Sequence, residues 1–590
     1  MGRLVATAET QERREVHGVE PRVRLVAYTH DPFGLAVASA RTCYASEFAF
    51  VGRLAPKGER TRVTLEQALP QHKRWLDEIG RFDTPHERRI ALVTTLKSDV
   101  QTSDLAAALD AFADLARQRA EGDAGLARSI YEAGHHTPFQ HPTFVFAFED
   151  VSRNVVESFF HNHTFYNSEQ QSQRYVEMKD ADVHVPAAVA ANPQARKVFE
   201  DAVRQSWEAY HALRERLIGP NLKVMGAIGK IKGQSEKQVH TDAEKKAQEM
   251  ARYVLPIAAA TQLYHTVSGI VLLRYVRMSQ AASAPAEAKL VVDAMVAEVR
   301  KVDPSFIDKV EEAPRPLDSH VEWRLAGDAP LEPLPAGRFS LLVNATPGAD
   351  AVVAAALREV TGSNLAQGDL LREVLDPGRN GVWNDTLNTW DHSPALRTLR
   401  HVHYTFRKRL SLTAYAQDQR HRMVPGSRPQ LGRLLGNDAL DVHVPDIIAH
   451  DAQSKGLYDA AIRVLWDAIG RLRTLGIPDA DLTYLLPNAT NITFHQSGDL
   501  LSFIHKWRLR LCFNAQKEIF DASLEELRQA QAVHPELTKW LGPPCTFVAA
   551  AQPPEKQDDV AACCPEGPRW CGVKVWIGFD AAKGKPKRPY

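Results

Sequence analysis

An internal repeat constrains this chain more than any other feature of its sequence. Residues 23–32 and 340–347 each contain a short apolar strand and a turn, and an Ala-rich stretch of helical character follows each of them. Within these units, residues 29–41 and 346–358 both run from Thr to Arg over 12 positions. Self-similarity of this kind indicates that one structural unit occurs twice in the chain.

Two more blocks recur in the same order. The first joins His-Thr-Pro or His-Ser-Pro to an aromatic strand and then to a Ser that opens a helix, Ser152 in one copy and Ser411 in the other. The second runs from Leu-Pro through an expected long helix to Ala-x-x-Glu, and its Pro and Glu are 31 positions apart in both 256–287 and 487–518. Three ordered blocks predict a tandem duplication of one α/β (α+β) domain, dominated by helix and with a small sheet in each copy.

The repeat and the composition between its blocks divide the chain into four parts. Proline is frequent and helical periodicity is absent after the first copy, which predicts a linker there. A polar, Lys-rich stretch at 219–241 predicts a loop that is inserted in the first copy only. The expected parts are a first domain at 20–310, a Pro-rich linker at 311–337, a second domain at 338–535 and a Cys/Pro/Gly-rich tail at 536–590.

The composition narrows the class of partner. The 590 residues include 72 Lys and Arg against 72 Asp and Glu, so no overall charge favours a nucleic acid polymer or an anionic membrane. A bound anion must therefore be held by a local group of arginines. The N-terminus lacks the apolar segment of a signal peptide, no apolar run is long enough to span a membrane, and six Cys are too few for a disulfide framework. These features predict a cytoplasmic protein.

Two polar clusters carry groups suited to an anion. In the first copy, Ser172 and Arg174 lie in the run Gln-Gln-Ser-Gln-Arg-Tyr, where a hydroxyl, a guanidinium and backbone N–H groups can surround a phosphate. The cluster at the end of the equivalent helix in the second copy consists of Gln417, Arg420, His421 and Arg422. Taken singly, each cluster is better explained as a solvated polar helix end.

Taken together, these motifs resemble the flavin-dependent thymidylate synthases. Members of that family carry Arg-His-Arg, then seven residues, then Ser-x-Arg in a single stretch. They also have Gly-His-x-Ser/Thr-Pro-x-x-His upstream, Arg-x-x-Leu-Pro downstream and Arg-x-x-x-x-Ala-Gln-x-Glu-Ile near the end. The same order and approximate spacing occur at 22–310 and again at 338–535. The resemblance implies two tandem copies of the flavin-dependent thymidylate synthase fold.

Each copy has lost part of this pattern, and the two losses are complementary. In the family, one subunit supplies a Gln, the first Arg of Arg-His-Arg and the late Arg to the nucleotide site, while its neighbour supplies Ser-x-Arg and the Arg before Leu-Pro. The complete set here is Gln417, Arg420 and Arg510 from the second copy with Ser172, Arg174 and Arg252 from the first. The opposite set has lost its residues at Asn162, Ser279, Gln430 and Thr483. The resemblance therefore implies one composite site between the two copies.

The resemblance also implies an activity and residue roles. The reaction is reductive methylation of dUMP to dTMP, in which methylenetetrahydrofolate supplies the carbon and FAD passes on a hydride from NADPH. The residues implied to bind the dUMP-like nucleotide are Arg174, Arg252, Gln417 and Arg420. Those implied to be catalytic are Arg510 and Ser172, which would lie near the pyrimidine, and His141, which matches the upstream His. Those implied to bind the flavin are Arg420, His421, Arg422 and His505.

Some of these assignments have alternatives. His141 is equally consistent with a core His on an aromatic strand, and Arg508 would replace Arg510 if the alignment shifts. Where the family holds flavin with Asn and Arg on the late helix, the second copy has Asp499 and Leu501, and the first has Ser268 and Ile270.

Three functions are consistent with the sequence. The first is thymidylate synthesis by a homodimer of these pseudo-dimers. The second is flavin- and folate-dependent modification of another pyrimidine nucleotide, and the third is non-catalytic binding of a nucleotide or flavin. None of the three involves a nucleic acid polymer or a membrane.

The tail suggests a metal site. Four Cys follow one another in a Gly- and Pro-rich segment, and Cys512 lies two positions after Arg510. Tetrahedral thiolates are the usual ligands of structural Zn²⁺. The candidate zinc ligands are Cys545, Cys563, Cys564 and Cys571, with ordinary reduced thiols as the alternative.

Overall fold

The computed structural model describes residues 15–42, 123–281, 284–310 and 334–589, together with the single residues 325 and 332. Most of the predicted linker at 311–337 lies outside these residues. Among the helices that are described, none is long and apolar enough to cross a membrane.

The first copy is built around a four-stranded antiparallel sheet. Its strand order is β2-β3-β6-β4. The strands are β2 (Arg22–Tyr28), β3 (Thr143–Ser152), β4 (Asn167–Gln170) and β6 (Ala260–Ser268). Along β3, Phe144, Phe146 and Phe148 are buried and alternate with less buried residues, so one face of this sheet carries the core of the first copy.

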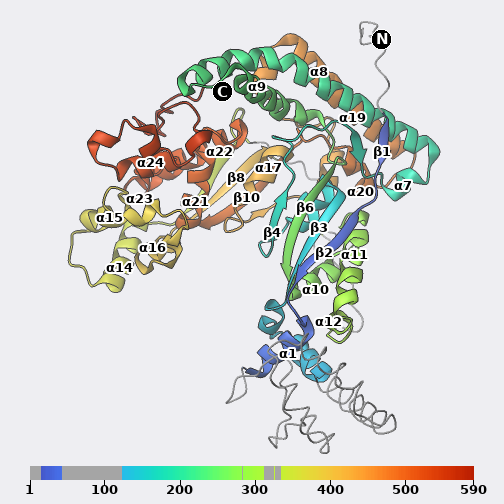
Figure 1. The fold of residues 1–590 in the computed structure, drawn as a ribbon, viewed down its shortest axis with the longest axis horizontal. Coiled ribbons are helices and arrows are strands. Elements are labelled where there is room, and N and C mark those ends of the chain that lie inside the picture. The colour runs from blue at the N-terminus through green and yellow to red at the C-terminus, as the bar shows by residue number, and fades with distance from the viewer. Residues whose placement is uncertain are drawn as a thin grey trace, which may run out of the picture.

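The second copy contains a sheet of the same design. Its strand order is β7-β8-β10-β9, so each strand takes the place of its counterpart in the first copy. The strands are β7 (Ser340–Ala345), β8 (His403–Ser411), β9 (Gly426–Ser427) and β10 (Asn491–Asp499). Even the register shift in the edge pair recurs, after Leu25 in one copy and after Leu342 in the other. The two sheets lie next to each other (Figure 1), and the predicted duplication is confirmed.

Helices cover the sheets in corresponding positions. α1 (Pro32–Thr42) follows β2, and α14 (Ala349–Thr361) follows β7, as the Ala-rich stretches predict. α11 (Ala286–Val302) packs against β2, and α22 (Lys517–Val533) packs against β7. The spacing of the repeat thus predicts these strand–helix units correctly.

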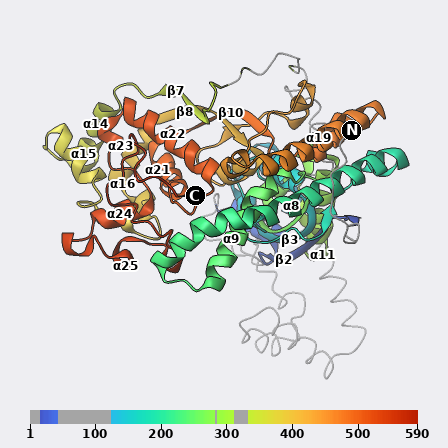
Figure 2. The same ribbon diagram turned by 90° about the horizontal axis from the view of Figure 1, so that it is seen from above.

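Three long helices lie along one end of both sheets. α8 (Pro193–Lys232) packs against α9 (Glu236–Ala251) from its own copy and against α19 (Ala452–Thr474) from the other copy. Figures 1 and 2 both show α8 and α19 side by side. The inserted loop predicted at 219–241 is therefore wrong: most of this stretch is helical, because α8 runs for 40 residues where α19 has 23.

The segment after each Leu-Pro also differs from the prediction of a single long helix. A strand comes first, β6 or β10, and a shorter helix then follows it, α10 (Gly269–Met278) or α21 (Leu500–Arg510). In β6 and β10, strongly buried and less buried residues alternate, which is the period of a strand.

The other described elements are short. A two-stranded parallel sheet pairs β1 (Val16–Gly18) with β5 (Ala181–Val183). The helices of the first copy are α6 (Arg153–Val155), α7 (Ala187–Ala190) and α12 (Ser305–Asp308). Those of the second copy and the tail are α15 (Gln367–Leu375), α16 (Pro394–Arg397), α17 (Leu412–Asp418), α18 (Asp446–Ala449), α20 (Asp479–Leu482), α23 (Pro535–Thr538), α24 (Pro544–Ala550) and α25 (Val560–Cys563).

The two Leu-Pro segments cross where the copies meet. The N–H of Ile257 donates to the carbonyl of Leu486 at 2.9 Å, and the N–H of Asn488 donates to the carbonyl of Leu255 at 2.8 Å. Each copy thus donates one of these hydrogen bonds and accepts the equivalent one, as expected around a two-fold axis. Apolar residues of both copies, including those of α8 and α19, join one continuous core. The copies therefore form an internal pseudo-dimer.

A buried carboxylate in each copy extends this symmetry. Glu287 accepts hydrogen bonds from the N–H of Ser152 at 2.7 Å, from the Ser152 hydroxyl, and from the hydroxyl of Tyr484 in the other copy at 3.0 Å. The Ser152 hydroxyl also accepts from the N–H of Val155, so Ser152 opens its helix as predicted. The equivalent group is Glu518 with Ser411 and Tyr253.

The group around Glu287 should contribute strongly to stability. Replacing this fully buried acceptor in Glu287→Leu leaves three donors unpaired, which should lower the free energy of unfolding by about 3 kcal/mol or more. Chemical denaturation measures the change. Lys289→Leu on the same helix is the control, because its exposed pair with Asp293 should be worth about 0.5 kcal/mol. Equal unfolding midpoints for the two variants would show that this buried group is not needed.

Candidate functional site

The turn after β4 places Arg174 between the copies. The Ser172 hydroxyl accepts from the N–H of Arg174 at 3.2 Å, which closes the turn. The Arg174 guanidinium is paired with Glu249 of α9 and donates to the carbonyl of Asn514 in the second copy at 2.9 Å. Burial opposes ionisation of Glu249, but Arg174 and Lys246 outweigh it and hold the pKa of Glu249 well below its usual range. Arg174 is thereby fixed as a cation.

Gln516 connects the two copies at the next position. Its side-chain carbonyl accepts from Arg252 of the first copy at 2.6 Å and also accepts from Gln417 of the second. Its amide group donates to the hydroxyl of Tyr253. One glutamine therefore brings Arg252 and Gln417, which belong to different copies, to the same point.

Arg510 and His421 complete this group from the second copy. Arg510 donates through Nε to Nε2 of His421 at 2.7 Å and through Nη2 to the carbonyl of Gln417 at 2.7 Å. Burial and the neighbouring Arg510 hold the pKa of His421 well below its usual value, so its ring is neutral and carries the proton on Nδ1. Burial lowers the pKa of Arg510 to about 10, and Arg174 and Arg420 are near enough to act in the same direction.

The group has unused hydrogen-bonding capacity. Three of its buried polar atoms have no hydrogen-bond partner among the described residues: Nε of Arg252, Oε1 of Gln417 and Nδ1 of His421. Burial also lowers the pKa of Arg252 to about 10 despite the nearby Glu249. Buried polar atoms are nearly always satisfied, so exceptions that converge on one place indicate a ligand site. The excess of guanidinium groups favours an anion.

A cavity of about 300 Å³ lies beside this group, between the copies. Arg420 lines it and pairs with Glu169 at 3.0 Å, while Arg422 donates to Asn167 at 3.0 Å and lies over the ring of Tyr166 at 5.3 Å. The lining residues are Tyr166, Asn167, Ser168, Glu169, Tyr264, Thr266, Arg420 and Arg422. This volume is at the lower end of the range of small-molecule sites, which is roughly 300–1,000 Å³.

The family of the chain follows from comparison with known proteins. A family profile described as "Thymidylate synthase complementing protein" matches residues 24–305 and 341–536. These two regions cover most of the chain and contain both sheets. The chain belongs to this family. Its membership confirms the resemblance inferred from the motifs and agrees with the helix-dominated α/β fold.

Curated relatives carry the name flavin-dependent thymidylate synthase. The Clostridium tetani protein is 31% identical over 173 residues, which is 29% of this chain and 64% of that protein, a little under two thirds. The Nitratidesulfovibrio vulgaris protein is 26% identical over 287 residues, 49% of this chain and 85% of that protein. The Geobacter sulfurreducens protein is 28% identical over 233 residues, 39% of this chain and 92% of that protein.

Among solved structures, a UMP/dUMP methylase from Streptomyces cacaoi bound with 5-Br dUMP is similar. It is 17% identical and covers 51% of this chain and 99% of its own, with a TM-score of 0.31. A likeness at this score carries no argument about function.

The opposite set of residues, which would form the second site of the pseudo-dimer, lacks the arginines of the family. Thr483 stands where Arg252 stands in the first copy, and its hydroxyl accepts from Asn154 at 3.3 Å. Ser279 is buried and donates to the carbonyl of Val276. The other two positions, Asn162 and Gln430, carry no charge. The structure thus gathers four predicted arginines on one side of the pseudo-dimer.

Two predicted residues lie elsewhere. His141 is exposed and precedes β3, whereas Ser152 ends that strand, so about 30 Å of strand separates them. His141 is therefore not a core histidine, and it lies at the opposite end of β3 from Ser152. Arg508 lies between the rings of Trp390 and Phe547, at 4.4 Å from each centroid, and so faces the tail.

The positions that depart from the family's flavin contacts have structural roles. Asp499 caps α21 by accepting from the N–H of Ser502 at 2.9 Å and pairs with Arg400 at 3.0 Å. Leu501 is buried in the second-copy core. Neither side chain is available to bind a cofactor. His505 remains close to Arg-His-Arg, since its ring centroid lies 5.7 Å from that of His421.

The predicted zinc ligands require a correction. Cys545, Cys564 and Cys571 line one small pocket, but Cys563 does not, because its thiol donates to the carbonyls of Lys556 and Gln557. Cys512 lines the pocket instead. In the described part of the chain, no group of three or more His, Cys, Asp or Glu side chains is placed to hold a metal ion.

Three residues that hold the arginine group together were given no role by the sequence analysis. Glu249 lies three positions before Arg252 on one helix face, a spacing that could have drawn attention to it. Gln516 belongs to the family's Ala-Gln motif and has a clearer signal. Asn514 acts through its backbone carbonyl, which no sequence pattern marks.

Four buried charged side chains form an ion-pair group close to Arg510 and His421. Lys408 pairs with Asp418 at 2.7 Å and with Glu526 at 2.6 Å, and Lys506 pairs with the same two carboxylates at 2.8 and 3.1 Å. Gln496 contacts both lysines. This group joins the end of α17 to α21, the two helices that carry the second-copy site residues.

Removing one charge from this group should be costly. Lys408→Met leaves two fully buried carboxylates facing a single ammonium, which should lower the free energy of unfolding by about 3–5 kcal/mol. Urea denaturation provides the measurement. Lys455→Met, which breaks an exposed pair with Asp459, is the control and should change stability little. A loss no larger than that of the control would contradict this role.

The same group should make the fold sensitive to acid. Burial opposes the charge of Asp418, but Lys408 and Lys506 outweigh it and lower the pKa of Asp418 well below its usual value. As the pH falls, the Asp418 carboxylate is therefore protonated first in the unfolded chain, near pH 4. The contribution of Asp418 to the free energy of unfolding is complete above about pH 5 and declines at lower pH. Unfolding midpoints at pH 7, 5 and 4 test this. Asp418→Asn should show a shallower dependence than the wild type between pH 5 and 4.

Proposed function

We propose that this chain is a flavin-dependent enzyme that methylates the pyrimidine ring of dUMP, at one composite site between its two copies. The observation that carries the proposal is the group formed between the copies by the buried Arg252 and partly buried Arg174 of the first copy with Gln417, Arg510 and the more exposed Arg420 of the second. Membership of the family supports the reaction class, and the names of the relatives support the substrate.

The nucleotide phosphate would bind to Arg174, Arg252 and Arg420. The first two are held within the interface by Glu249 and Gln516, so little rotational freedom is lost on binding. The pKa of Arg252 is lowered to about 10 because burial disfavours its charge, and a bound phosphate would relieve that cost. The unpaired Nε of Arg252 supplies a further donor.

The pyrimidine would lie toward Gln417, Ser172 and Arg510. A uracil ring offers one N–H donor and two carbonyl acceptors, which complement the unpaired Oε1 of Gln417 and a hydroxyl donor from Ser172. Arg510 is held by His421, so its charge is directed rather than mobile. A guanidinium beside the ring would stabilise negative charge that develops there during transfer of the carbon.

The flavin would be held beside the nucleotide by Arg420, Arg422 and the neutral His421, with His505 behind it. The cavity lined by these arginines and by Tyr166 and Tyr264 has the aromatic and cationic groups that suit such a ring. Asp499 and Leu501 do not fit the contacts usual in the family, so this chain would hold the rest of FAD differently. When bound, the flavin supplies the hydride, with NADPH and methylenetetrahydrofolate as co-substrates.

Substitution of site residues tests the composite site. Arg174→Ala and Arg420→Ala lie in different copies, and each should weaken dUMP binding by about 10- to 100-fold, because each removes a charge-assisted contact of about 1.5–3 kcal/mol. Calorimetry on the purified chain measures binding, and growth of a thymidine-requiring bacterium measures activity in cells. Both variants should fail to support growth.

Asn162→Ala is the matched control, because Asn162 stands at the position equivalent to Arg420 and is exposed. It should bind and support growth like the wild type. Full activity of Arg174→Ala would show that the first copy does not contribute to the site.

Purified chain should also be yellow, and its flavin should be reduced by NADPH and reoxidised with dUMP and methylenetetrahydrofolate. Turnover with another pyrimidine nucleotide but not dUMP would assign the alternative substrate. Tight nucleotide binding without any turnover would indicate a binding protein. Two such chains would pair to give four copies of the domain.

A further inference from the structure

The second pocket lies where the tail meets the second copy. It is lined by residues from the loop that follows Arg510, from 543–545 and from 564–576. The volume is about 20 Å³, which is room for about one water-sized particle. The tail segments lie beyond 536, where the match to the family ends. This pocket is therefore a feature of this chain and not of the nucleotide site.

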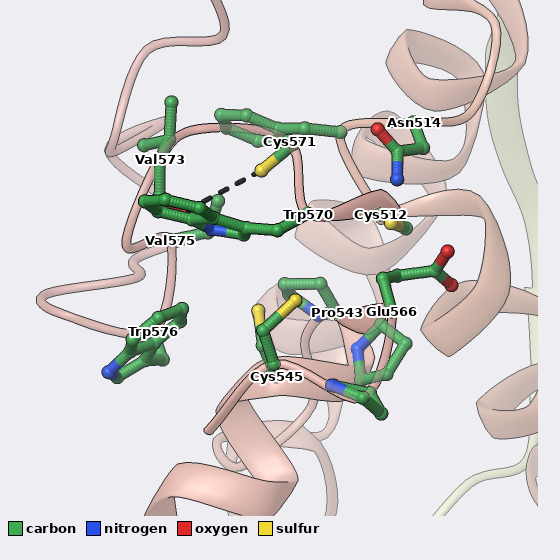
Figure 3. Close-up of a pocket in the computed structure, with 14 residues that line it drawn as sticks. Cys512, Asn514, Pro543, Cys545, Glu566, Trp570, Cys571, Val573, Val575 and Trp576 are labelled. Atoms are coloured by element: carbon green, nitrogen blue, oxygen red, sulfur yellow. Dashed lines mark hydrogen bonds between the residues drawn. The ribbon is translucent and has the colours of Figure 1, made fainter. Parts of the chain in front are cut away.

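Four cysteines line this pocket: Cys512, Cys545, Cys564 and Cys571. Figure 3 shows the sulfur atoms of Cys512, Cys545 and Cys571 directed toward the space between them. None of these thiols is in a disulfide. Such a concentration of thiols is notable in a chain with only six Cys, because they come from segments far apart in the sequence.

We propose that Cys512, Cys545, Cys564 and Cys571 bind one Zn²⁺ ion, which fastens the tail to the loop after Arg510. Four thiolates from separate segments are a common ligand set of structural zinc, and a closed tetrahedral site leaves no position for a substrate. The pocket suits an ion of this size, since its other walls are largely apolar side chains such as Pro543, Val573 and Trp576.

Metal binding requires the thiols to move together, because no three His, Cys, Asp or Glu side chains of the described residues stand in metal-binding positions. The Cys571 thiol donates to the carbonyl of Val573 at 3.5 Å, so it must turn away from that carbonyl to reach the ion. Each thiol releases its proton to solvent as its Zn–S bond forms, which gives a site of charge −2. Glu566 also lines the pocket but is paired with Arg569 at 3.3 Å.

The consequence reaches the arginine group. Cys512 and Asn514 lie on the same short loop, and the carbonyl of Asn514 accepts from Arg174 at 2.9 Å. The side chain of Asn514 donates to the carbonyl of Arg569 in the tail at 2.7 Å. An ion bound to Cys512 would therefore fix the loop that orients Arg174.

The test is the metal content of the full-length chain, purified under reducing conditions with zinc in the growth medium. Elemental analysis should find about one zinc per chain. Cys512→Ser and Cys571→Ser should lose it, while Cys563→Ser, which alters the neighbour of Cys564, should retain it. Co²⁺ exchanged into the wild type should give thiolate charge-transfer and tetrahedral ligand-field bands, a readout that does not depend on folding of the variants.

Three results would overturn the proposal. The first is a wild-type chain that takes up neither zinc nor Co²⁺, and the second is a Cys563→Ser variant that loses zinc while Cys512→Ser keeps it. The third is an intact mass lower by two hydrogens, which would indicate a disulfide. None of these measurements involves nucleotide, so a negative result for zinc binding can be distinguished from a negative result for the proposed enzyme activity.

Discussion

The reciprocal crossing of the two Leu-Pro segments is the constraint on which the rest of this structure depends. Ile257 and Asn488 donate across the pseudo-two-fold axis to the carbonyls of Leu486 and Leu255, so neither copy can close its own backbone hydrogen bonds without the other. A buried N–H that lost this partner would have no access to water, which makes separation of the copies expensive. The apolar core shared by α8 and α19 adds to this cost. Arg252 precedes the first Leu-Pro by three residues, so the crossing that joins the copies also sets where a first-copy arginine meets the second copy.

The proposed site draws on both copies, which would explain how each copy can lose different residues while one complete set is kept. Two-fold symmetry provides two such places, and each needs one contribution from either copy. If one of the two sites is sufficient, residues that serve only the second site no longer need to be charged. Thr483, for example, stands at the position where the first copy keeps Arg252. The support beneath the sites has diverged too. Gln496 and His265 hold the same register position opposite Phe406 and Phe146, yet Gln496 joins the buried charge group whereas His265 joins Tyr275 at 2.9 Å. The charged support thus belongs to the copy that supplies Arg510.

The features that could be predicted from the sequence are those set by local rules. Ser152 and Ser411 open helices because a hydroxyl caps the first turn, and their spacing within the repeat revealed them. That Arg174 and Arg420 serve one site remains a prediction, which rests on the complementary losses of the two copies and needs no knowledge of distances. What failed was governed by tertiary contacts. The polar stretch at 219–241 looks like a loop, but it forms helix because its apolar residues pack within the α8–α9 hairpin. Likewise, the sequence could not show that Cys512 lies beside the tail cysteines in one pocket while Cys563 does not, because sequence distance does not reveal that a loop and a tail meet.

The tail of the chain contributes to the position of Arg174. An arginine that binds phosphate must be held in place before the ligand arrives, since ordering a long side chain on binding weakens affinity. Glu249 fixes one edge of the guanidinium from the first copy, and the carbonyl of Asn514 fixes the other from the second. The carbonyl is only as rigid as its loop, and that loop is bounded by Arg510 on one side and Gln516 on the other. Tail residues such as Arg569 hold the same loop from outside. Two segments of the second copy, its late helix and its tail, thus converge on the position of one first-copy side chain.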